Sequence, residues 1–131
     1  TIHPSNLASN QAIRLLGVAT GVNVNATGDQ AVIAINNSTN YSVSNVVFTN
    51  ASISLTTAAA GLFTAPSAAG TAIVANAALS ALTGSTVVSQ RTVASTATQS
   101  AQNLYLHVGT AQGAAATMDV YVYGYDFSTF S

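Results

Sequence analysis

The chain has very few charged side chains and no cysteine. Among its 131 residues are two arginines, no lysine and three acidic residues, so charged side chains make up only 4% of it. Globular proteins usually have about a quarter. Two cationic side chains cannot follow a phosphate backbone, which excludes ordinary electrostatic binding of nucleic acid. The lack of cysteine excludes disulfides and thiolate chemistry.

The sequence also lacks the features of disordered and membrane-spanning chains. Its hydrophobic content is 49% and its net charge is −1, so the chain should fold. Ser, Thr, Asn, Gln or Gly interrupts every apolar run well before the roughly 20 residues of a membrane span, so we expect no membrane partner. No basic stretch followed by an apolar one marks a signal peptide at the N-terminus. The length fits one domain.

Titratable side chains are too few for most catalytic sites. Beside the arginines the chain has two histidines and three aspartates. Asp119 and Asp126 could form a carboxylate pair, but an outward strand charge and a turn aspartate are the more frequent situation. His107 has no second metal ligand nearby in the sequence, and neither a Gly-x-Ser-x-Gly elbow nor a phosphate-binding loop occurs. We therefore expect a non-enzymatic protein without catalytic, metal-binding or cofactor-binding residues.

Apolar and polar residues alternate with a period of two in several segments after residue 12, as in half-buried strands. Clusters of Asn, Ser, Thr and Gly separate these segments and are typical of turns. Many short strands with polar turns indicate an all-β fold, either a β-sandwich or a jelly roll. Residues 1–11 are polar and contain Pro4, which favours an extended N-terminal arm. Residues 12–131 then form a single β-sandwich domain.

One segment, residues 68–82, is compatible with a short helix. One helical face would carry Val74, Ala78, Ala81 and Leu82. The alanines favour a helix, and Gly84 stands where helices often end. Residues 71–74 equally fit the start of a strand. Both alternatives stay open at this point.

The clearest strands lie near the C-terminus. Residues 104–108 and 118–125 alternate aliphatic side chains with Tyr, His and Asp. Small residues at 109–116 connect them, so we expect an antiparallel pair joined by a loop. One face of such a pair would be aliphatic. The other face, the predicted tyrosine face, would carry Tyr105, His107, Tyr121, Tyr123 and Tyr125.

This predicted tyrosine face has two interpretations. Tyrosine buries a large area while keeping a polar tip, which suits a contact surface. Alternatively, the face is the second layer of the domain's own core. A nearly uncharged surface favours association, so we expect an oligomer or assembly component. The interface candidates are the predicted tyrosine face and three residues of the arm, Ile2, His3 and Pro4.

Two stretches of the sequence carry a resemblance to known proteins. The longer is LYLHVGTAQGAAATMDVYVYG at residues 104–124. The other runs from FTAP at residues 63–66 through GTAIV at residues 70–74 to the two leucines at 79 and 82. Both stretches resemble small virion proteins of tailed bacteriophages. The similarity covers about half of the chain and contains no catalytic signature.

The resemblance implies a capsid decoration or cement protein. Such proteins are typically β-sandwich or jelly-roll modules that trimerise on the capsid surface and clamp neighbouring major capsid protein subunits, often with an N-terminal arm. We thus expect a homotrimer in the virion, bound to the major capsid protein and needing no cofactor. A tail- or fibre-associated module, or a cell-surface glycan-binding β-module with sugar-stacking tyrosines, remains the alternative.

Overall fold

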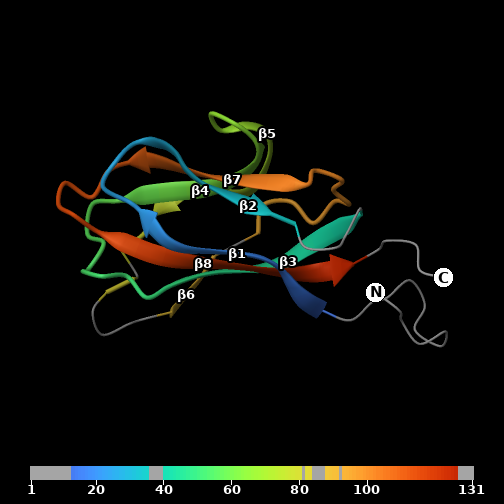
Figure 1. The fold of residues 1–131 in the computed structure, drawn as a ribbon, viewed down its shortest axis with the longest axis horizontal. Helices are drawn as coiled ribbons and strands as arrows, with labels where there is room; N and C mark the ends of the chain where they lie inside the picture. The colour runs from blue at the N-terminus through green and yellow to red at the C-terminus, as the bar shows by residue number, and fades with distance from the viewer. Residues whose placement is uncertain (1–12, 36–39, 81, 84–87, 92, 127–131) are drawn as a thin grey trace.

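The computed structural model describes residues 13–35, 40–80, 82–83, 88–91 and 93–126, and these residues form eight β-strands without a helix (Figure 1). Most strands alternate inward apolar and outward polar side chains, as the sequence pattern predicts. The strands are β1 (Ile13–Asn23), β2 (Gly28–Ala34), β3 (Tyr41–Thr49), β4 (Ala59–Ala65), β5 (Ala69–Ala78), β6 (Val88–Arg91), β7 (Asn103–Thr110) and β8 (Thr117–Asp126).

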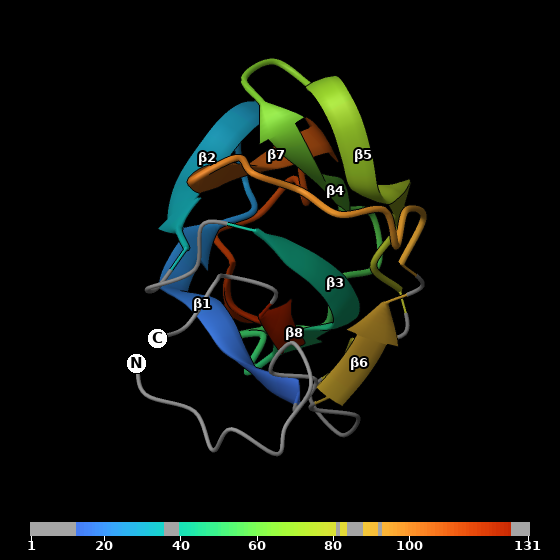
Figure 2. The ribbon, with the colours of Figure 1, turned by 90° about the vertical axis from the view of Figure 1, so that its right-hand side faces the viewer.

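The strands form two four-stranded antiparallel sheets that pack face to face (Figures 1 and 2). Sheet A has the order β1-β8-β3-β6, and sheet B has the order β2-β7-β4-β5. The pairs β1–β8, β2–β7, β3–β6 and β4–β5 are those of one long hairpin rolled over itself. This arrangement is the jelly roll, a form of β-sandwich, and it confirms the predicted all-β fold class.

The core lies between the two sheets. Both sheets contribute fully buried aliphatic side chains, such as Leu104 and Leu106 from β7 and Val120 and Val122 from β8. The largest fully buried side chains are those of Tyr41 and Phe48, both on β3. The inward side chains of both sheets are apolar and fill this core. The outward side chains of the central strands form the two broad faces of the molecule.

The helix alternative for residues 68–82 is wrong, and the strand alternative is confirmed. Residues 69–78 form β5, an edge strand that pairs with β4 through a tight turn. Ser67 and Ala68 in this turn have positive φ angles of 60° and 58°. Ile73 and Val74 are buried against the core, and the area they bury there outweighs the helix propensity of the alanines.

The predicted pairing of the two C-terminal strands is also wrong. β7 lies in sheet B and β8 in sheet A, so the connection between them crosses from one sheet to the other. Alternation correctly identified both strands, but it carries no information on which strands become neighbours. The predicted arm, residues 1–11, lies outside the described residues. Within the part of the chain that is described, no helix could span a membrane.

Candidate interaction surface

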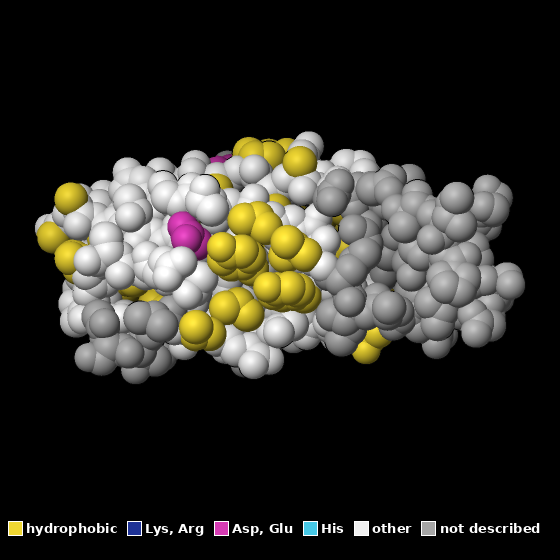
Figure 3. Space-filling view, turned by 60° about the horizontal axis from the view of Figure 1, so that its bottom comes forward, with side chains coloured by type: hydrophobic (Ala, Val, Ile, Leu, Met, Phe, Trp, Pro, Cys, Tyr) yellow, Lys and Arg dark blue, Asp and Glu magenta, His cyan; other side chains and the backbone are white. Residues whose placement is uncertain are grey.

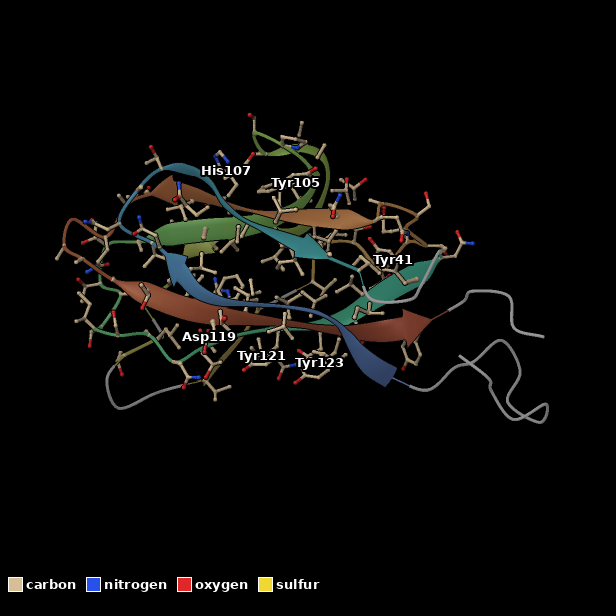
Figure 4. All side chains as sticks on the ribbon, viewed as in Figure 1. Tyr41, Tyr105, His107, Asp119, Tyr121 and Tyr123 are labelled. Carbon is tan, nitrogen blue, oxygen red and sulfur yellow. The ribbon has the colours of Figure 1, made fainter. Side chains whose placement is uncertain are left out.

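Three tyrosines of β8 project from the outer face of sheet A. Val120 and Val122 of the same strand are fully buried in the core. Since side chains alternate along a strand, Tyr121, Tyr123 and Tyr125 point the other way, and all three are only partly buried. Figure 4 shows Tyr121 and Tyr123 on the side of sheet A that faces away from sheet B.

Aliphatic side chains flank these tyrosines on the neighbouring strands. Tyr121 lies between Val18 of β1 and Val47 of β3, and Tyr123 is paired with Leu15 of β1. Leu15 and Val18 are each 39% exposed, a large fraction for such side chains. We call these five residues the sheet-A patch. Figure 3 shows the apolar side chains gathered on this face, with an acidic side chain at their border.

Asp119 lies beyond Tyr121 on the same face and organises two adjacent chain segments. One carboxylate oxygen accepts a hydrogen bond from the backbone N–H of Gly21 at 2.9 Å, and the other accepts one from Asn50 Nδ2 at 2.9 Å. Gly21 and Asn50 both have positive φ angles, 62° and 55°. Asp119 therefore ties together two segments with left-handed backbone positions, which gives the carboxylate a structural role.

Asp119 and Asp126 do not form a carboxylate pair. They stand near the two ends of β8, seven residues apart. In an extended strand this separation places their Cα atoms about 23 Å from one another. The two groups cannot share a proton or flank one bond of a substrate.

His107 and Tyr105 lie on the opposite face of the molecule, on the outside of sheet B (Figure 4). His107 Nδ1 is 3.0 Å from Asp29 Oδ1, and its ring meets Phe63 edge to face, with 6.2 Å between the ring centroids. The backbone N–H of Ser67 donates to Asp29 Oδ2 at 2.8 Å. This bond from Ser67, aided by His107, holds the pKa of Asp29 below its usual value despite the opposing effect of burial.

The predicted tyrosine face is therefore divided between two opposite surfaces. Tyr121, Tyr123 and Tyr125 stay together on sheet A, whereas Tyr105 and His107 are separated from them by the whole core. The three arm candidates, Ile2, His3 and Pro4, lie outside the described residues. The three tyrosines of β8 do not form a second layer of the core, because the side chains of β8 that enter the core are on the other face of this strand.

Sequence reasoning missed the aliphatic half of the sheet-A patch. Leu15, Val18 and Val47 join the tyrosines only because β1 and β3 are the neighbours of β8. The sequence of β1 did indicate an outward apolar side chain, because Leu15 stands directly before the buried Leu16. Two consecutive leucines in a strand put one on each face, so one of them had to face outward.

The arrangement of the sheet-A patch suits protein contact better than chemistry. It presents aliphatic surface and phenolic hydroxyls that can donate or accept, and the carboxylate at its border, Asp119, already accepts two hydrogen bonds. Among the described residues no group of three or more His, Cys, Asp or Glu could hold a metal ion. No protein-family model matches the chain, and neither the curated proteins nor the solved structures include a significant match to it.

Proposed function

We propose that this protein is a structural virion protein, a capsid decoration or cement protein that binds the major capsid protein at the capsid surface as a homotrimer. The observation that carries the proposal is the sheet-A patch, where Leu15, Val18, Val47, Tyr121 and Tyr123 adjoin on one exposed face. Contiguous apolar surface rimmed by polar residues marks interaction sites on soluble proteins. Tyrosines at its centre are the residues that interfaces favour.

The outer face of sheet A fits this role better than the outer face of sheet B. Sheet B carries the Asp29 carboxylate, hydrogen-bonded to His107, and removing a charged carboxylate from water costs free energy. Its most exposed aliphatic residue, Val32, is 58% exposed but stands beside Tyr105 and not within a row of aliphatic neighbours. We assign the docking surface to the sheet-A patch for these reasons.

The fold is compatible with this role but does not carry it. Jelly rolls occur in viral capsid domains and also in lectins and other proteins, so the architecture suits a capsid protein and a glycan-binding module equally. The part played by the N-terminal arm and the trimeric state rest on the sequence resemblance. The contact residues of sheet A rest on their exposure and strand pairing.

A matched pair of substitutions tests the docking surface. Val18→Lys places a charge in the sheet-A patch, and Val32→Lys makes the same change on sheet B; the two valines are 39% and 58% exposed. Each purified variant is mixed with particles that lack this protein, and co-sedimentation and cryo-EM density are measured. We expect Val18→Lys to abolish decoration and Val32→Lys to bind like the wild type. Normal decoration by Val18→Lys would overturn the assignment.

Salt provides a second test of the same contact. The chain offers only five charged residues, so an apolar and hydrogen-bonded contact should persist as ionic strength rises. Steep dissociation between low and moderate salt would contradict the proposal. Density on the tail instead of the head would assign the protein to the tail- or fibre-associated class.

The second candidate function is a cell-surface glycan-binding module. Tyr121 lies on the same face as Asp119, two residues away, and aromatic rings and carboxylates are groups that can stack on sugars and accept their hydroxyl hydrogen bonds. Both oxygens of Asp119 already bind protein N–H groups, which weakens this candidate. A glycan array decides: binding lost in Tyr121→Ala but kept in Tyr105→Ala would favour it, and an array without binders would remove it.

A further inference from the structure

A surface pocket of about 280 Å³ lies at one open edge of the sandwich, away from the sheet-A patch. β5 is an edge strand of sheet B, and β6 is an edge strand of sheet A. Both strands contribute to the pocket, so it opens between the two sheets. Its walls are mainly small apolar side chains with two polar ones. The lining residues are Val74, Ala75, Ala77, Gln90, Arg91 and Ala94.

The guanidinium of Arg91 is held in one orientation at this pocket. It lies over the ring of Phe48, with 5.6 Å between the guanidinium carbon and the ring centroid. Nη2 donates to the carbonyl of Ala78 at 3.0 Å, and Nη1 donates to Ser89 Oγ at 3.2 Å. These contacts already restrict the rotamers of this long side chain, so binding a ligand would cost little additional side-chain entropy.

The charge of Arg91 has no acidic partner among the described side chains. The carboxylates of Asp29 and Asp119 are bonded elsewhere, on the outer faces of sheets B and A. Its Nε–H is buried and has no hydrogen-bond partner within the described part of the chain. Burial also lowers the pKa of Arg91, as expected for a cation without a counter-charge. Of the five N–H groups of a guanidinium, the bonds to Ala78 and Ser89 use one on Nη2 and one on Nη1. Because Nε–H is buried, the two groups left for a ligand are the second N–H of Nη1 and the second N–H of Nη2.

We infer that this pocket binds a carboxylate group carried on a compact apolar or hydroxylated body. An oriented guanidinium can donate two parallel hydrogen bonds, one from each Nη, to the two oxygens of a carboxylate. The alanines at 75 and 77 leave room beside it for the carrier. The inference does not depend on the proposed function, because the pocket and the sheet-A patch share no residue.

A carboxylate fits this pocket better than a phosphate does. One arginine neutralises one negative charge. The chain has no lysine, and its other arginine, Arg14, stands on β1, at the opposite edge of sheet A from β6. A phosphate group would leave part of its charge uncompensated in a partly buried, mainly apolar pocket, which is unfavourable. Gln90, the other polar lining residue, contributes amide groups but no charge.

NMR titration of the wild-type protein tests the inference. Sodium D-glucuronate is the probe, and D-glucose is the matched control, since the two sugars differ in the carboxylate group. Sodium chloride controls for ionic strength. We expect saturable shifts of the Arg91 side-chain N–H and of the Ala75 and Ala77 amides with glucuronate, and none with glucose. Equal shifts with both sugars, or none with any acid tested, would overturn the inference.

A second probe identifies the source of the carboxylate. N-acetylglutamate amide presents the same group on a peptide-like carrier. Saturable binding of this probe alone assigns the pocket to an acidic side chain of a protein partner. Binding of glucuronate alone assigns it to an acidic sugar, and both outcomes support a carboxylate site.

Two variants separate binding from folding. Arg91→Lys keeps the charge but loses the two-pronged donor geometry, and we expect affinity to fall by roughly tenfold, as for one lost charge-assisted hydrogen bond. Ala77→Leu leaves Arg91 in place and fills the pocket from the exposed side of β5. A folded Ala77→Leu variant that still binds the acids unchanged would disprove the site, whatever Arg91→Lys does to stability.

Discussion

The hydroxyl of Tyr41 donates a hydrogen bond to the carbonyl of Ala101, 60 residues further along the chain. Tyr41 is fully buried at the start of β3 in sheet A, whereas Ala101 leads into β7 of sheet B. The backbone of Tyr41 also exchanges two hydrogen bonds with Gln99, at 3.0 and 2.7 Å. One residue therefore ties the two sheets together at this end of the sandwich.

Tyr41→Phe should destabilise the protein by about 1 kcal/mol, because the carbonyl of Ala101 loses a buried donor. Urea denaturation followed by circular dichroism measures the change in the free energy of unfolding. Tyr123→Phe is the control, since that ring lies partly exposed on the outer face, and its effect should stay within about 0.5 kcal/mol. Equal effects of the two variants would contradict the linking role of Tyr41.

Stability should fall at alkaline pH because of the same tyrosine. Burial raises the pKa of Tyr41 from 10.0 to about 12 in the folded protein. Well below pH 10.0 the hydroxyl is protonated in both states, so its contribution is complete there. As the pH rises toward 12 the unfolded chain releases this proton first, and unfolding becomes favoured. Melting temperatures measured from pH 9 to 12 should drop less in Tyr41→Phe than in the wild type.

Gln112 joins the β7–β8 connection to the segment before β4. Its Oε1 accepts from the N–H groups of Thr57 and Ala58, both at 3.0 Å, and its Nε2 donates to the carbonyl of Ser54 at 3.2 Å. We expect Gln112→Ala to cost about 2 kcal/mol, since several polar groups lose their partner together.

Gln112→Glu keeps the two accepted hydrogen bonds but cannot donate to Ser54. It should therefore be less destabilising than Gln112→Ala in the same urea experiment. A larger loss of stability in Gln112→Glu than in Gln112→Ala would contradict this expectation. It would show that a negative charge at this position costs more than the loss of all the hydrogen bonds of Gln112.

Gly124 permits the close approach of β8 and β3. A Cβ atom at this position would lie 2.1 Å from the carbonyl oxygen of Ser42 and 2.8 Å from Leu16 Cδ1. Because the first obstacle is backbone of a paired strand, Gly124→Ala should cost about 3 kcal/mol. Gly21→Ala is the control: nothing lies within 4 Å of its Cβ, and only its φ of 62° is unfavourable, at about 1 kcal/mol. Equal losses would refute the steric explanation.

Asp29 should make stability depend on pH in the acid range. Its pKa is lowered from 3.8, chiefly by the N–H of Ser67 and further by His107, so its contribution is complete above pH 3.8 and is lost as the pH falls through the lower folded value. The wild type should therefore exceed Asp29→Asn in melting temperature at pH 6, and the difference should shrink toward pH 2. His107→Gln should retain most of this dependence, because Ser67 is the larger cause.

The sequence by itself determined that this chain folds as an all-β domain and that it carries few charged side chains. Period-two alternation at residues 104–108 and 118–125 identified two strands correctly, because inward and outward side chains differ in polarity whatever the strand pairs with. Ile73 and Val74 carry a similar signal, since β-branched side chains favour strands. They are buried in a strand, although the surrounding alanines favour a helix.

Only the tertiary structure decided which strands became neighbours, and with them the candidate surfaces. In a jelly roll most consecutive strands lie in opposite sheets. Tyr105 on β7 and Tyr121 on β8 occupy equivalent positions in the alternation of consecutive strands, yet they lie on opposite faces of the molecule. The same topology places Leu15 and Val47, distant in sequence, on the two strands that flank β8. Strand pairing depends on long-range packing between the sheets, which alternation along one strand does not encode.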